Sequence, residues 1–145
     1  MRIALVVSEY HAFITDGLEA GAHDALVEAG VPDDRIERFV VPGAYELAQA
    51  ASRLAATGRF EAIVCLGCLI KGETPHFDYI AHAAAHGIMR AGQASGVPTS
   101  FGVLTTLTAE EAMARAGAGP GNKGREAALA ALGMAALFRS IEGRT

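Results

Sequence analysis

Residues 62–70 read Ala-Ile-Val-Cys-Leu-Gly-Cys-Leu-Ile, and Lys71-Gly72-Glu73-Thr74-Pro75-His76 follows them directly. The uninterrupted apolar run is typical of a strand buried on both faces, as in the interior of a parallel sheet. Gly72 and Pro75 interrupt the run, and a helical pattern then continues from His76 to Ser95, where Gly96 ends it. This stretch predicts a strand, a short loop and a long helix, the repeating unit of a parallel α/β sheet.

The rest of the chain repeats this alternation. Further strands are predicted over Ile3–Val7, Arg35–Val41 and Thr99–Leu104. Further helices are predicted over Phe13–Ala29, from the Pro42-Gly43 turn to Thr57, from a capping box at Thr108–Glu111 to Arg115, and from the end of a glycine-rich loop at Gly117–Gly121 to Ser140. Strands separated by helices need crossover connections. We therefore expect a three-layer α/β/α sandwich with a four-stranded parallel sheet and helices on both faces.

Length and composition favour one soluble domain over residues 1–145. Of the 145 residues, 51% are hydrophobic and 19% charged, and the formal net charge is −4. These values exclude a disordered chain and oppose sequence-independent nucleic-acid binding, which requires a basic face. No apolar run approaches the roughly 20 residues of a membrane-spanning helix. Two cysteines and no export signal predict a reducing compartment, so we expect a cytoplasmic protein.

Two short motifs match known site patterns in spacing but not in context. Cys65 and Cys68 have the spacing of a redox pair, but they lie inside the predicted strand, where positions three apart point to opposite faces. We interpret them as two core thiols. Gly119–Gly124 matches the G-x-G-x-x-G dinucleotide pattern, but it follows a helix instead of a strand. A flexible loop explains its glycines, although not the cations Arg115 and Lys123 beside them.

His82 and His86 are four residues apart on one face of the long helix, a spacing that can hold a metal ion. No glutamate follows His82, no third ligand is evident, and the three intervening residues are alanine. A helix-packing or subunit-contact face is therefore the favoured interpretation. We expect no metal site and no cofactor.

The loop between the best strand and the longest helix has the features of a catalytic site. A helix amino end presents free backbone N–H groups and a positive dipole end, which together bind anions. Thr74 adds a hydroxyl there, and His76 lies where it can transfer a proton to a bound ligand. A lone histidine is more often structural, but this one follows the carboxyl end of a strand, where α/β sheets bind ligands.

Two other loops and two cations extend this candidate site. Gly43, Ala44 and Glu46 follow the second strand, where small residues allow close backbone approach and the carboxylate can accept hydrogen bonds from a polyol. Tyr10 follows the first strand and offers a flat surface for an aromatic ring. Arg115 and Lys123 supply cations for an anionic substrate in an otherwise acidic chain. Each of these residues alone fits an ordinary structural role. Together they predict a site for a planar heterocycle and a phosphate, with one proton-transferring histidine and no metal.

Four blocks of this sequence resemble the lumazine synthase family, in the family's order and spacing. The blocks are Val41–Glu46, Gly67–Tyr79, Phe101–Thr106 and Arg115–Gly124, and the likeness spans essentially the whole chain. The resemblance implies a flavodoxin-like sandwich and a transferase of riboflavin biosynthesis. In the implied reaction, 5-amino-6-(D-ribitylamino)uracil condenses with 3,4-dihydroxy-2-butanone 4-phosphate to give 6,7-dimethyl-8-ribityllumazine, phosphate and water.

The resemblance also implies roles for individual residues. His76 would move protons, and Arg115 would hold the phosphate with help from Glu73 and Thr74. The ribityl arm would lie against Gly43, Ala44 and Glu46. The pyrimidine edge would meet the main chain of Leu69 and Ile70. The implied substrate-binding set also contains Tyr10, His11, Tyr45 and Cys68. Phe101, Arg115 and Lys123 would reach the site from a neighbouring subunit, in an assembly based on pentamers.

Two departures from the family pattern affect these expectations. Tyr10-His11 stands where the family usually has Phe-Asn, and an aromatic–histidine pair resembles a subgroup in which some members form decamers. The sequence also lacks the amino-terminal extension of capsid-forming members, so we expect a pentamer or decamer. Two alternatives remain at this point. A flavin- or lumazine-binding protein on the same fold is motivated by Tyr10-His11. A flavodoxin-like electron carrier with FMN ranks last, because it gives Arg115 and Lys123 no role.

Overall fold

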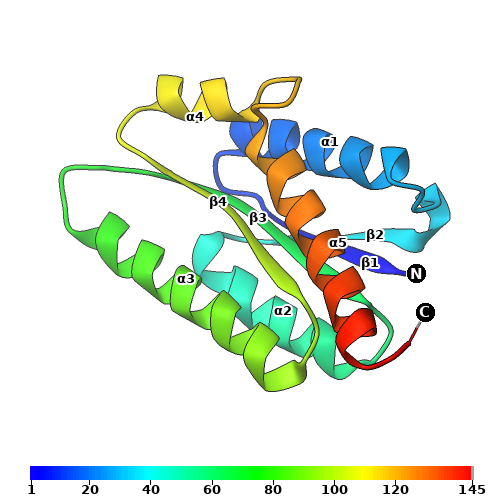
Figure 1. Cartoon of the computed structure of the whole chain (residues 1–145). Coiled ribbons are helices and arrows are strands. Elements are labelled where there is room, and N and C mark those ends of the chain that lie inside the picture. The colour runs from blue at the N-terminus through cyan, green and yellow to red at the C-terminus, as the bar shows by residue number, and fades with distance from the viewer. Residues whose placement is uncertain (145) are drawn as a thin grey trace.

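A computed structural model describes residues 1–144, and its strands alternate with helices along the chain (Figure 1). The strands are β1 (Ile3–Ser8), β2 (Ile36–Val41), β3 (Ala62–Ile70) and β4 (Thr99–Thr106). The helices are α1 (Ala12–Glu28), α2 (Leu47–Ala56), α3 (His76–Ser95), α4 (Ala109–Ala116) and α5 (Lys123–Ile141), with short 3-10 turns at Asp33–Arg35 and Ala44–Glu46. The four strands form one parallel sheet in the order β2-β1-β3-β4. The predicted α/β sandwich is confirmed.

The strand order determines which face each helix covers. The chain leaves β1 toward β2 in one direction, and it leaves β2 and then β3 in the opposite direction. Because such crossovers are right-handed, α1 lies on one face of the sheet and α2 and α3 lie on the other. Helices α4 and α5 return to the face of α1 (Figure 1).

Each face of the sheet has its own apolar layer. One layer joins α1, α4 and α5 to alternate strand residues such as Leu5, Val64 and Leu66. The other joins α2 and α3 to the intervening residues such as Val6 and Ile63. The strands are hydrophobic on both sides because both sides are covered. Within residues 1–144, no helix combines the length and apolar character needed to cross a membrane.

Element boundaries agree with the sequence expectations except at two loops. The fourth strand continues to Thr106, two residues past its predicted end, so Thr105 and Thr106 belong to the sheet instead of to a loop. The predicted helix after Gly43 begins as a 3-10 turn, and the α-helix itself starts at Leu47. The helix predicted over His76–Ser95 has those bounds. The capping box is also confirmed, since the Glu111 amide donates to Thr108 Oγ1 at 3.1 Å.

Asn122 connects α1, α4 and α5 through a buried side chain. Its Oδ1 accepts from the Arg125 amide at 3.0 Å and thereby caps α5. Its Nδ2 lies within donor distance of the carbonyls of Gly17, Ala116 and Gly117, at 3.0, 3.1 and 2.9 Å. The residue is 3% exposed, so these carbonyls have little access to water. A loss of the amide would therefore leave buried acceptors without a donor.

Glycines allow the close helix contact that surrounds Asn122. A Cβ on Gly124 would lie 1.9 Å from the Leu18 carbonyl oxygen, and a Cβ on Gly21 would lie 2.2 Å from Asn122 Oδ1. Side chains at either position would force α1 and α5 apart. The glycine-rich segment that resembles a dinucleotide motif is thus a packing element, because it supplies both Asn122 and Gly124. The interpretation of this segment as a flexible loop is wrong for these two residues.

We predict that Asn122→Ala lowers the free energy of unfolding by about 2–4 kcal/mol, because it removes a helix cap and the amide donor together. Thr108→Ala is the matched control, since it removes a helix cap alone and should cost about 1 kcal/mol. Urea unfolding of the variants at one protein concentration measures both values. Equal losses for the two variants would show that the Nδ2 contacts contribute nothing.

Candidate active site

The largest cavity that contains predicted site residues lies at the switch point of the sheet, where the outgoing chain connections change direction. Strands β1 and β3 are neighbours, but their outgoing connections run to opposite faces, and α/β sheets bind ligands beyond such a point. A cavity of about 900 Å³ opens there, between the loops that follow β1, β2 and β3. We call it the switch-point cavity. It is lined by Tyr10, His11, Pro42, Gly43, Ala44, Tyr45, Glu46, Cys68, Leu69, Ile70, Gly72, Thr74, His76, Phe77, Tyr79 and Ile80.

His76 lines this cavity from the first residue of α3. It is exposed, as is Thr74, which lines the same cavity. Pro75 occupies the N-cap position. Its side chain cannot accept a hydrogen bond, so no capping side chain pairs with the first N–H groups of the helix. The positive end of a helix of 20 residues therefore lies beside an accessible imidazole. This arrangement can bind an anionic group and exchange protons with it.

The loop after β2 forms a second wall of the cavity. Gly43 is extended, and the Glu46 amide donates to its carbonyl at 3.2 Å. A Cβ on Gly43 would lie 3.3 Å from Glu46 Oε1, so the carboxylate lies over this glycine. Ala44 is buried, whereas Tyr45 is exposed. The wall thus combines a carboxylate acceptor with a small-residue backbone, as needed for a chain of hydroxyl groups.

Aromatic side chains form the rim after β1. Tyr10 is 66% exposed, and its ring packs edge-on against His11 with centroids 4.5 Å apart. The Phe13 ring also packs edge-on against His11, with centroids 5.9 Å apart. Partial burial lowers the pKa of His11 below its ordinary value of 6.5, because desolvation disfavours the charged ring. The rim therefore presents an exposed phenol ring that is supported by a mainly neutral imidazole at pH 7.

His11 also has a strained backbone. It is the one residue other than glycine with positive φ in the described chain, at φ 61° and ψ 46°. Asparagine adopts this left-handed conformation more readily than most residues, and histidine is also enriched there. Its carbonyl accepts from the amides of Ile14 and Thr15, so the conformation starts α1.

The floor of the cavity is the carboxyl end of β3. Cys68, Leu69 and Ile70 all line it, and they become gradually less buried toward the loop. Cys65 and Cys68 belong to apolar layers on opposite faces of the sheet, as the strand alternation predicts. Burial raises the pKa of Cys65 to about 12 and that of Cys68 to about 11. Both are core thiols, as predicted.

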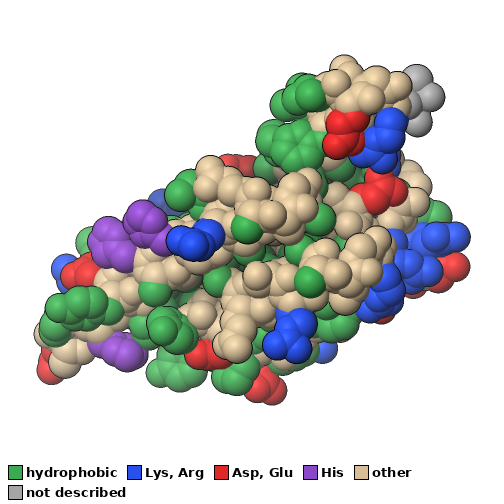
Figure 2. Space-filling view, turned by 90° about the horizontal axis from the view of Figure 1, so that it is seen from below, with side chains coloured by type: hydrophobic (Ala, Val, Ile, Leu, Met, Phe, Trp, Pro, Cys, Tyr) green, Lys and Arg blue, Asp and Glu red, His purple; other side chains and the backbone are tan. Residues whose placement is uncertain are grey.

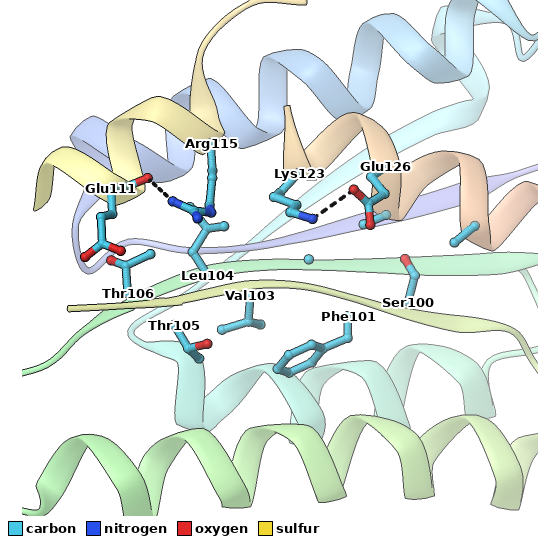
Figure 3. Close-up of a pocket in the computed structure, with 13 residues that line it drawn as sticks. Ser100, Phe101, Val103, Leu104, Thr105, Thr106, Glu111, Arg115, Lys123 and Glu126 are labelled. Carbon is cyan, nitrogen blue, oxygen red and sulfur yellow. Dashed lines mark hydrogen bonds and ion pairs between the residues drawn. The ribbon is translucent and has the colours of Figure 1, made fainter. Parts of the chain in front are cut away.

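A separate cavity of about 340 Å³ lies along the edge strand β4 (Figure 3). We call it the edge-strand cavity. Phe101, Arg115 and Lys123 line it together with Ser100, Gly102, Val103, Leu104, Thr105, Thr106, Glu111, Glu126, Ala127 and Ala130. In Figure 3, Arg115 and Lys123 lie on the α4–α5 side of β4. Phe101, Val103 and Thr105 point to the opposite side of the strand, as pleating requires.

The two cations of this cavity are only partly neutralised. Arg115 Nη1 donates to the Glu111 carbonyl at 3.0 Å, which leaves most of its guanidinium donors free of protein acceptors in the described chain. Lys123 Nζ lies 3.0 Å from Glu126 Oε2. Both partners of that pair are accessible to water, so it is weak and can exchange for another anion. The cavity can therefore accept a phosphate on two cations.

The structure brings most predicted residues together, but not all of them. Phe101, Arg115 and Lys123 lie in the edge-strand cavity and not in the switch-point cavity. Glu73 lines neither cavity, although its neighbours Gly72 and Thr74 line the larger one. The described residues contain no cluster of three or more metal-ligating side chains.

Some lining residues were absent from the sequence predictions. Phe77, Tyr79 and Ile80 line the switch-point cavity from the first five residues of α3. Their position soon after His76 could have indicated that they line the site. The sequence alone, however, does not show which side of the start of the helix faces the loops. Glu111 and Glu126 line the edge-strand cavity beside the cations. Helical spacing places Glu126 three residues after Lys123, which could have predicted the ion pair.

The fold and cavities define a parallel α/β sandwich with a large cavity at the switch point of its sheet. The family model that describes 6,7-dimethyl-8-ribityllumazine synthase matches residues 1–139. A protein of Deinococcus radiodurans named 6,7-dimethyl-8-ribityllumazine synthase is 47% identical over 142 residues, which cover 98% of this chain and 92% of that protein. The chain belongs to the 6,7-dimethyl-8-ribityllumazine synthase family, as the sequence motifs predicted.

We predict that neither thiol reacts with a soluble disulfide reagent at pH 8 while the protein is folded. With pKa values raised to about 11 and about 12, the thiolate form is scarce, and the sulfur atoms are buried. Unfolding in guanidinium should release both thiols for rapid reaction. Absorbance of the released reagent measures the number. Fast modification of Cys68 in the folded protein would contradict the assigned burial.

Proposed function

We propose that this chain is a lumazine synthase that condenses 5-amino-6-(D-ribitylamino)uracil with 3,4-dihydroxy-2-butanone 4-phosphate. The products are 6,7-dimethyl-8-ribityllumazine, phosphate and water. Family membership supports the reaction, and the switch-point cavity carries the proposal structurally. That cavity places an aromatic rim, a carboxylate and an exposed histidine at a helix amino end within one space.

The two ends of the cavity suit the two parts of the first substrate. The pyrimidine would stack on Tyr10, while its polar edge meets the main chain of Leu69 and Ile70. The ribityl hydroxyls would extend along Gly43 and Ala44 and donate to Glu46. Tyr45, Cys68 and His11 would complete the contact surface. Stacking on a flat ring and polar contacts at the edge together fix orientation, which is a large part of the rate gain in a condensation.

The chemistry needs proton transfers and stabilisation of the leaving phosphate. The substrate amine attacks the ketone carbon, and loss of water gives an imine. Proton loss next to the imine then expels phosphate by cleavage of its C–O bond, and ring closure loses further water. His76 would carry protons in these steps. Thr74, with the Glu73 and Thr74 backbone N–H groups, would bind the phosphate beside the helix end.

We further propose that Phe101, Arg115 and Lys123 act in the switch-point cavity of a neighbouring copy. They lie on both sides of the open edge strand β4, so a copy docked at this edge would meet all three residues. Large apolar side chains are exposed on β4 and along α5, which is unusual for a surface that stays in water. They are Phe101, Leu129, Met134, Leu137 and Ile141. The proposed assembly is the pentamer typical of the family, or a decamer built from two.

Two smaller proposals accompany the reaction. Residues 1–145 act as one catalytic domain, and no cofactor takes part, because the amine is already a nucleophile and phosphate is a good leaving group. Both cysteines are free thiols, which fits a location in the cytoplasm.

We predict that Arg115→Ala lowers kcat/KM about 100-fold, because a phosphate clamp stabilises charge in the transition state. His76→Ala should cost only about tenfold, since water can replace part of its proton transfer. A steady-state assay follows the lumazine chromophore against the uncatalysed rate, with the exposed Arg53→Ala as a control for charge loss elsewhere. An equal or smaller loss for Arg115→Ala than for His76→Ala would reject this ranking. Tight product binding with no acceleration by the unmodified protein would instead indicate a binding protein.

A mixing experiment tests whether the site is shared between copies. The Tyr10→Ala/Glu46→Ala variant impairs the switch-point cavity, and Arg115→Ala impairs the edge-strand cavity. Refolding equal amounts together should restore activity to about a quarter of the unmodified protein, because random assembly pairs an intact cavity with an intact neighbour at one site in four. Each variant refolded alone is the control. No gain on mixing would show that both cavities act within one chain.

A further inference from the structure

The exposed face of α3 carries a histidine pair that the proposed reaction does not use. His82 and His86 are both exposed, and Ala83, Ala84 and Ala85 separate them. Figure 2 views the layer formed by α2 and α3 and shows histidine side chains gathered on this surface. The sequence favoured a helix-packing or subunit-contact face. Both side chains lie in the open, so neither packs on another helix of this chain, and a subunit contact stays a prediction.

Helix geometry brings the two imidazoles within reach of one ion. Residues four apart on a helix have Cβ atoms about 5–6 Å apart on the same face. A nitrogen–metal bond of about 2 Å on each side lets the two rings converge on a single ion between them. Both residues lie in the interior of α3, between His76 and Ser95, so the helix fixes their spacing. The alanines between them add no bulk that would hold the rings apart.

Neither ring is committed to another partner within residues 1–144. No hydrogen bond or ion pair there involves His82 or His86, whereas His23 Nε2 lies 2.6 Å from Asp33 Oδ1. Free imidazole nitrogens are the commonest side-chain ligands of zinc, nickel and copper ions. Arg90 lies one turn beyond His86 on the same helix, and its positive charge opposes a bound cation. We therefore expect a site of modest affinity.

We propose that His82 and His86 together bind one divalent transition-metal ion on the surface of each chain. The described residues form no group of three or more metal-ligating side chains, so water would fill the remaining coordination positions. The ion would be exchangeable and would lie on α3, outside both cavities. This proposal does not depend on the proposed reaction.

Zinc binding by isothermal titration calorimetry tests the pair directly, with untagged full-length protein and ZnCl2. The informative variant is His86→Ala/Met89→His, which keeps the number of histidines on the same face. Its two rings lie seven residues apart, about 10 Å along the axis, and cannot share one ion. Met89 is exposed, so the change should not disturb the fold, which circular dichroism checks. His23→Ala removes the competing histidine–carboxylate pair.

We expect one zinc ion per chain and at least tenfold weaker binding in both His86→Ala and the displaced-pair variant. His23→Ala should bind as the unmodified protein does. Copper(II) bound to the unmodified protein should show two nitrogen ligands by electron paramagnetic resonance. Equal affinity in the displaced-pair variant would overturn the proposal, as would loss of binding in His23→Ala. One ion per two chains would also overturn it, because the ion would then be shared between copies.

Discussion

The contact of the Asn122 amide with three backbone carbonyls is the constraint on which much of the structure depends. It joins the start of α5 to α1 and to the end of α4, and the glycines around it allow backbones to meet almost directly. Arg115 lies one residue before one of these carbonyls, and Lys123 follows Asn122. The same contact that closes one face of the sandwich therefore fixes the backbone positions from which both cations extend.

The direction of the crossovers separates the functional groups of the chain. The loops after β1, β2 and β3 meet at the switch point and gather the aromatic, acidic and histidine side chains. Helices α4 and α5 lie on the other side of the sheet and leave their cations along β4. The proposed reaction joins a heterocyclic amine to a phosphate-bearing ketone and would therefore use both groups of residues. In the proposed assembly, association between copies would bring the two groups together.

The fold followed from local patterns because those patterns and the tertiary structure agree. The apolar run over Ala62–Ile70 is buried along nearly its whole length, and the two cysteines within it face opposite layers as alternation requires. The Thr108–Glu111 capping box needs only neighbouring residues to form, and it was predictable for that reason. The α3 bounds were likewise predictable, since Pro75 and Gly96 mark both ends.

Features that depend on distant segments were not predictable from the residues. Asn122 stands in a segment that reads as a flexible loop, and its role appears only when Gly17, 105 residues away, lies against it. The neighbours of Glu73 in its motif line the switch-point cavity, but Glu73 itself does not. The direction of a side chain in a loop depends on its surroundings, which the sequence does not show. The left-handed backbone of His11 was also not predictable, because it arises where the chain must turn sharply from β1 into α1.

The alternation of side chains along β4 has a consequence for how this chain can change in evolution. Phe101, Val103 and Thr105 serve one side of the strand, and Ser100, Leu104 and Thr106 serve the other. Inserting or deleting one residue would exchange the two sets and disturb both apolar layers at once. A single substitution in β4 changes one side of the strand, whereas a change in its length affects both sides. Length variation among descendants of this chain should instead collect at exposed turns such as those at Gly30 and Gly58, where an added Cβ would meet no atom within 4 Å.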